Sequence, residues 1–167
     1  MGMIGNYTMT DESTINKILA RDITFEEFFY DDEDEPTEDF LDIDKSWHII
    51  YFTLTGAASD ANNDNPLSKV VLGGRYLGEQ NIDFEFPRCY LLAEEAKQVN
   101  AALRAVSSDD FAKKFDFEAM LKNDIYIVSP AGNADDLLEY SLDFFEAIKL
   151  FFEKAASDNK CLICWID

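Results

Sequence analysis

The residues best suited to acid–base chemistry lie close together in one short stretch of the chain. Two carboxylates, Asp42 and Asp44, stand beside Lys45, and His48, the one histidine, follows three residues later. Paired carboxylates can perform acid–base catalysis when burial raises the pKa of one of them. An enzyme or binding protein could then use a small-molecule pocket lined by Asp42, Asp44, Lys45, Trp47 and His48. We favour a simpler interpretation, in which Asp44 caps a helix and Lys45 offsets local negative charge.

Cys161 and Cys164 have the C-x-x-C spacing of some redox and metal sites. Their segment reads as a strand, in which residues three apart point to opposite faces and cannot share a metal ion. A thioredoxin-like pair would instead stand at a helix N-terminus. We therefore expect buried core cysteines. No motif supports a couple of Cys89 with His48 or a Ser-His-Asp triad, so we expect no catalytic residue, metal or cofactor.

A predicted helix must position Asp44 and His48. Asp44 is its expected N-cap and Gly56 its expected end. Apolar side chains recur at positions i, i+3, i+4 and i+7, which form one face of a helix. They are Trp47, Ile50, Tyr51 and Leu54. We expect a strongly amphipathic helix whose aromatic face anchors the core.

Several motifs in and around this helix are informative together. Asp-Ile-Asp-Lys-x-Trp occupies residues 42–47, and Leu-Thr-Gly occupies residues 54–56. With them we note Met-Gly-Met-Ile-Gly at 1–5, Asn-Pro-Leu-Ser-Lys-Val-Val-Leu-Gly at 65–73, Phe-Asp-Phe-Glu-Ala-Met at 115–120, and Ile-Tyr at 125–126. This set resembles the YfbM-like family of bacterial proteins, whose function is unknown, although Ile127 stands where that family usually has proline. The resemblance implies a compact α/β domain over most of the chain and carries no catalytic residues.

The remaining pattern favours one α/β domain over residues 1–167, with α+β as the alternative. A short strand is expected at residues 3–9, and residues 125–128 read as another. The longest helix is expected from Asp135 to about Ala156. The continuous apolar run from Cys161 to Ile166 predicts a central strand that is covered on both faces. We expect a small mixed sheet covered by about six helices, with the first and last strands inside it.

The charge balance limits the function classes. The chain has 34 acidic and 14 basic residues, a formal net charge of −20. Such a field repels nucleic acid and anionic membrane surfaces, and it favours a basic protein partner. Solubility alone is the other explanation. The opening residues lack a secretory signal, and three cysteines argue against a disulfide framework, so we expect a cytoplasmic protein.

One segment concentrates this charge, because seven of the nine residues at 31–39 are acidic. Such blocks repel themselves and stay extended, which favours a solvated loop over a partner-binding surface. If it does bind a partner, Tyr30 and Phe40 are candidate apolar anchors. The candidate partner-binding residues are Glu26, Glu27, Tyr30, Asp31, Asp32, Glu33, Asp34, Glu35, Glu38, Asp39 and Phe40.

Three functional hypotheses follow. The first is a non-enzymatic immunity protein, which would bind the basic cleft of a bacterial toxin domain and neutralise the toxin. The second is an enzyme or a binding protein that uses the pocket near Asp42, Lys45 and His48. The third is a housekeeping protein of unassigned role, which is what the family resemblance alone implies.

Overall fold

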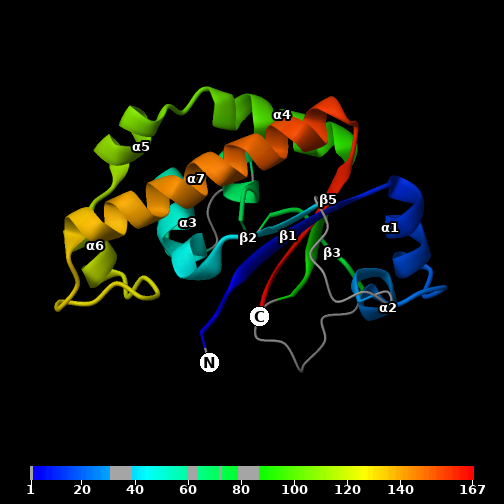
Figure 1. Cartoon of the computed structure of the whole chain (residues 1–167), viewed down its shortest axis with the longest axis horizontal. Helices are drawn as coiled ribbons and strands as arrows, with labels where there is room; N and C mark the ends of the chain where they lie inside the picture. Colours follow the sequence, from blue (N-terminus) through cyan, green and yellow to red (C-terminus); the bar gives the residue numbers. More distant parts are fainter. Residues whose placement is uncertain (1, 31–38, 60–63, 72, 79–86) are drawn as a thin grey trace.

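A computed structural model describes residues 2–30, 39–59, 64–71, 73–78 and 87–167. In this part of the chain, five strands form one sheet with helices packed around it (Figure 1). The strands are β1 (Gly5–Thr10), β2 (Phe40–Asp42), β3 (Arg75–Tyr76), β4 (Cys89–Leu91) and β5 (Cys161–Ile166). The expected α/β class is confirmed.

The sheet has the strand order β2-β1-β5-β4-β3, so the first and last strands both lie inside it, as predicted. Every described strand pair is antiparallel, and the expectation of a mixed sheet is wrong. The reason lies between β4 and β5. Two helices, α4 (Ala93–Arg104) and α7 (Ala134–Ser157), pack against each other and run in opposite directions (Figure 1). The chain therefore crosses the sheet twice before β5, and it returns antiparallel to β4.

Strand β5 is central and its six residues are all buried, which confirms the prediction from its apolar run. Alternate side chains enter different clusters. Leu162, Cys164 and Ile166 join the larger cluster, which includes residues of α4 and α7. Cys161, Ile163 and Trp165 join a second cluster with the first two helices of the chain. The two cysteines thus point to opposite faces, as expected.

The described residues form seven α-helices, close to the six or so expected. Besides α4 and α7 these are α1 (Glu12–Leu19), α2 (Phe25–Phe29), α3 (Trp47–Thr55), α5 (Ser108–Lys114) and α6 (Phe117–Lys122), with short 3-10 helices η1 (Asp44–Ser46) and η2 (Pro66–Lys69). Side chains of Thr24, Ser107, Asp116 and Asn133 accept hydrogen bonds at the N-termini of α2, α5, α6 and α7. None of the described helices combines the length and hydropathy of a membrane span.

Helix α3 is buried on almost every side, so the predicted amphipathic helix is wrong in this respect. Seven of its nine residues are buried. The predicted apolar face lies in the larger cluster, whereas Ile49 and Phe52 pack in a third cluster with Met120 of α6. The predicted end is confirmed, because Gly56 caps the helix with φ 73°, a conformation that glycine adopts without steric cost.

Residues 125–128 are not the strand that their apolar character predicts. Ile127 has φ 64°, and the N–H of Val128 donates to the carbonyl of Ile125, so the chain turns here. Ile125 is nevertheless buried, in the cluster that also holds Ile49 and Phe52. The apolar side chains fill a space beside α3, and this packing needs no neighbouring strand.

Candidate functional site

The two carboxylates of the signature motif build a turn between β2 and η1. Asp42 Oδ1 accepts a hydrogen bond from the backbone N–H of Asp44 at 2.6 Å. Asp44 has φ 47°, and its Oδ2 accepts from the Tyr140 hydroxyl at 3.0 Å. The same hydroxyl oxygen accepts from the N–H of Lys45 at 3.1 Å. Burial and the bond to Asp44 raise the pKa of Tyr140 well above its usual range, so the hydroxyl keeps the proton that it donates to Asp44.

The predicted role of Asp44 as N-cap is therefore wrong. Helix α3 begins at Trp47, and the residue before it, Ser46, makes no side-chain cap bond. The Ser46 hydroxyl donates instead to the carbonyl of Ile43 at 2.6 Å. A 3-10 turn thus leads directly into α3, and the Asp44 side chain holds a neighbouring helix.

Trp47 and Lys45 hold the N-terminal segment of the chain. The Trp47 indole Nε1 donates to the carbonyl of Met3 at 3.1 Å, and the N–H of Met3 donates to the Tyr126 hydroxyl at 2.9 Å. A Cβ added at Gly2 would lie 2.3 Å from Lys45 Cε, so the lysine side chain covers that glycine closely. Segments far apart in the sequence meet here, and the motif residues have structural roles.

His48 is held by the backbone through both ring nitrogens. Its Nδ1 accepts from the N–H of Tyr126 at 2.9 Å, so the proton sits on Nε2, which donates to the carbonyl of Ala58 at 2.8 Å. The ring stacks on Trp47 with 4.7 Å between centroids. Burial lowers the pKa of His48 from 6.5. The neutral imidazole thus connects the backbone at Tyr126 to the backbone at Ala58, and it has no free nitrogen for general-base catalysis.

We expect the stability of the protein to fall as pH is lowered through about 6.5, because of His48. The folded state holds the His48 pKa below its unfolded value. The unfolded chain therefore binds more protons between these two values, and acid favours unfolding in that window. Urea unfolding of the parent and of His48→Gln at several pH values would measure this. Since the chain has no second histidine, the variant should lack that component. An unchanged profile between pH 7 and the lowered pKa would contradict the assignment.

The three cysteines are buried and free. Burial raises the pKa of Cys89 to about 11 and that of Cys164 well above its ordinary value. These thiols stay protonated at neutral pH, and a protonated thiol is a poor nucleophile. His48 bonds to backbone groups through both nitrogens, so it forms no couple with Cys89. In the described ranges, no cluster of His, Cys, Asp or Glu side chains is arranged to hold a metal ion.

The predicted partner surface is described only in part. Asp31, Asp32, Glu33, Asp34, Glu35 and Glu38 lie outside the described residues. Of the others, Glu26 pairs with Arg88 at 2.7 Å, and Asp39 pairs with Lys154 at 3.3 Å. Glu27 closes the capping box of α2 with Thr24.

The two predicted anchors of that surface differ. The side chain of Tyr30 is 66% exposed and can contact a partner. Phe40 is half-buried against Phe29 and Trp165, with ring centroids 5.5 Å and 6.2 Å away, so it belongs mainly to the second cluster. Only Tyr30 therefore has the exposure of an apolar anchor, and binding of a partner here stays a prediction.

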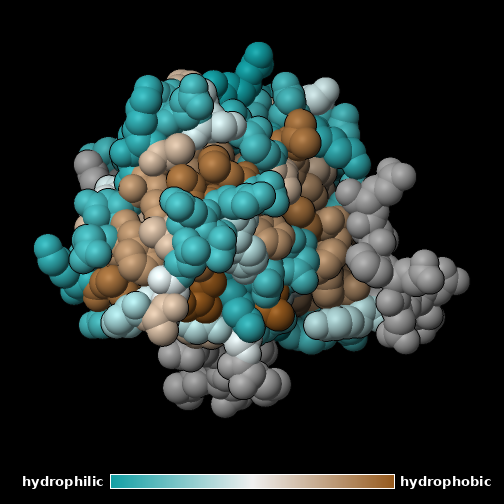
Figure 2. Space-filling view, turned by 60° about the vertical axis from the view of Figure 1, so that its left-hand side comes forward, coloured by the Kyte–Doolittle hydropathy of each residue, from teal (hydrophilic) through white to brown (hydrophobic). Residues whose placement is uncertain are grey.

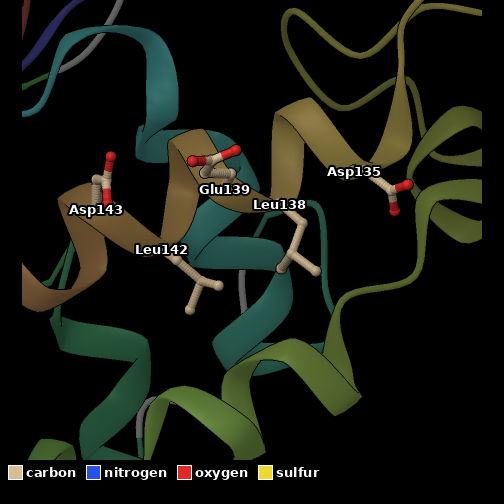
Figure 3. Close-up of a pocket in the computed structure, with 5 residues that line it drawn as sticks. All are labelled: Asp135, Leu138, Glu139, Leu142 and Asp143. Atoms are coloured by element: carbon tan, nitrogen blue, oxygen red, sulfur yellow. The ribbon is translucent and has the colours of Figure 1, made fainter.

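The structure shows a surface groove on α7 that sequence reasoning missed. Figure 3 shows Leu138 and Leu142 pointing to one side of the helix, while Glu139 and Asp143 point to the other. With Asp135 they line an open groove of about 260 Å³. The leucines are half-buried and the three carboxylates exposed. The signal in the sequence was the four-residue spacing of the three acids, which places them on one helix face.

Comparison with known proteins agrees with this architecture. The family described as "Domain of unknown function (DUF1877)" matches residues 1–165. Protein YfbM of Escherichia coli (strain K12) is 31% identical over 160 residues, which cover 94% of this chain and 89% of that protein. The crystal structure of YfbM from Escherichia coli, a protein of unknown function, superposes with a TM-score of 0.76 at 20% identity, covering 98% of this chain and 99% of that one.

A sheet of this order with its helices defines a single mixed α/β fold that is shared with the YfbM structure. The chain belongs to the DUF1877 family. This confirms the resemblance to YfbM-like proteins that its sequence motifs indicated.

Proposed function

We propose that this chain is a non-enzymatic acidic protein-binding domain, and that it acts as a cytoplasmic immunity protein which neutralises a cognate bacterial toxin. Its partner would be a basic toxin domain. The observation that carries the proposal is the formal net charge of −20 on a chain of 167 residues. Toxins that act on nucleic acids or nucleotides need cationic clefts, and a protein with a strong negative field associates quickly with such a surface.

The roles of the candidate reactive groups support binding over catalysis. His48 bonds to backbone groups through both ring nitrogens, and Asp44 bonds the Tyr140 hydroxyl. Cys89 is buried with a raised pKa. A general base or nucleophile needs a free, suitably ionised atom within reach of substrate. These side chains hold the fold together, so the surface charge is the better guide to function.

Co-expression tests the proposal directly. A toxic protein encoded next to this gene would be expressed in bacteria with and without this chain, and survival would be counted. We expect the chain to restore growth and to co-purify with the toxin as a complex. A matched control is the chain with Phe145→Ala, which should fold poorly and protect poorly. If no adjacent gene product is toxic, or if the chain gives no protection, the proposal is wrong.

A further inference from the structure

The groove on α7 suggests how such a partner docks. We propose that it receives a basic amphipathic helix of the protein partner, an inference that rests on the proposed function. Apolar side chains of that helix would fill the space at Leu138 and Leu142, and its lysines or arginines would meet Asp135, Glu139 and Asp143. Amphipathic helices bind in this way when apolar anchors at three- and four-residue spacing enter a groove on the partner.

The spacing of the carboxylates matches a helical partner. Asp135, Glu139 and Asp143 follow one another at four-residue intervals along α7. An α-helix rises 1.5 Å per residue, so successive members stand about 6 Å apart along the axis. Cations at four-residue intervals on a second helix, lying alongside the first, have the same spacing. Each carboxylate can therefore meet its own cation.

Within the part of the chain that the structure describes, these three charges have no neutralising partner. No ion pair or side-chain hydrogen bond among the described residues reaches the carboxylate of Asp135, Glu139 or Asp143. Glu146, further along the same helix, differs, since it accepts from the Ser108 hydroxyl and lies 3.9 Å from Lys149. The beginning of α7 thus keeps its negative charge available to an external cation.

The size and chemistry of the groove exclude other occupants. At about 260 Å³ it is smaller than the roughly 300–1,000 Å³ of typical small-molecule pockets, and its floor is leucine. Nucleic acid and anionic lipid are repelled by the carboxylates, and so is a second copy of this acidic chain. Figure 2 shows that hydrophilic and hydrophobic residues lie side by side on the face of the molecule that it views.

A synthetic peptide provides the probe. It would be a fluorescein-labelled helix-forming peptide of about 20 residues, with a leucine stripe flanked by lysines at four-residue spacing, and binding would be followed by anisotropy at two salt concentrations. The groove variant combines Asp135→Asn, Glu139→Gln and Asp143→Asn. The control variant combines Glu12→Gln, Asp22→Asn and Asp158→Asn, which removes three exposed charges from other parts of the surface. Thermal unfolding would show that both are folded.

We expect the groove variant to bind the peptide about tenfold more weakly than the parent, and with a smaller salt dependence, because three exposed ion pairs are lost. The control variant should stay within about twofold, since only the general field changes. Leu138→Ala with Leu142→Ala should also weaken binding about tenfold, but with the salt dependence of the parent, since apolar contact and no charge is removed. Both leucines also pack against the larger cluster, so thermal unfolding would first show that this variant is folded.

Equal losses in the groove and control variants would overturn the inference, because the field of the whole chain would then explain binding. Normal binding by the leucine variant would overturn it as well. The toxin assay separates this inference from the proposed function. A groove variant that still neutralises the toxin with the affinity of the parent would place the docking surface elsewhere and leave the immunity role standing. If the peptide binds through the groove but the chain neutralises no toxin, the docking surface is supported and the immunity role is wrong.

Discussion

Phe145→Ala should destabilise the protein by about 3–5 kcal/mol, a loss typical of a large ring removed from a core. The Phe145 side chain is fully buried in the larger cluster. Its ring stacks on Phe111 at 4.4 Å between centroids, and Lys149 Nζ lies 5.5 Å from its centre. Truncation would remove these contacts and leave a cavity between α5 and α7. Urea unfolding, with the midpoint and slope fitted together, measures the effect.

Leu150→Ala is the matched control on the same helix. The Leu150 side chain is 67% exposed, so its truncation should change the free energy of unfolding by less than about 0.5 kcal/mol. If the two variants lost similar stability, the packing of α7 described above would be wrong. A Phe145→Leu variant should recover part of the loss, since it refills part of the cavity with apolar volume.

Gly74→Ala should cost about 3 kcal/mol, because a left-handed backbone and a close contact act together there. Gly74 has φ 105°, a conformation that residues with a side chain rarely adopt. A Cβ at this position would lie 2.1 Å from the carbonyl oxygen of Tyr90. The backbone would have to move at the start of β3, where Arg75 pairs with Tyr90. Thermal and urea unfolding would both report this loss.

Gly56→Ala separates the two contributions at Gly74. Gly56 also has positive φ, at 73°, but an added Cβ would meet nothing within 4 Å. The substitution should therefore cost only the conformational preference, about 1–2 kcal/mol. Equal losses at the two glycines would mean that the contact with Tyr90 relaxes freely, contrary to the expectation.

The features that the sequence predicts correctly depend on local rules. The apolar run of β5 indicated a strand covered on both faces, because strands that are buried on both faces have near-continuous apolar sequences. Gly56 indicated a helix end, and α3 does end there. Each of these signals needs only the chemistry of a few neighbouring residues.

The features that were missed depend on contacts between distant segments. Asp44 looked like an N-cap because its neighbours form a helix, yet its carboxylate meets Tyr140, 96 residues away. The direction of β5 depends on α4 and α7 packing as an antiparallel pair. The sequence also does not show that His48 Nδ1 accepts a hydrogen bond from the N–H of Tyr126, which occupies the nitrogen that a general base would need. Local patterns carry no information about these partners.

The candidate site divides in the same way. The acids at four-residue spacing on α7 are visible in the sequence, and any helix would place them on one face. The sequence does not show which of the acids on α7 already have a partner within the fold. Glu146 accepts a hydrogen bond from Ser108 and lies near Lys149, whereas Glu139 has no such contact among the described residues. Lys149 lies three residues after Glu146 on the same helix, but the hydrogen bond from Ser108 depends on the arrangement of α5 beside α7.

The central claim is that the surplus negative charge of this chain serves to bind a cationic protein. The most direct measurement is the association rate constant with the toxin domain that we propose as its partner, followed by stopped flow from about 0.05 M to about 0.5 M salt. Electrostatic attraction predicts fast association at low salt and a steep decline as salt screens the field. A rate constant that does not change with ionic strength would contradict the claim.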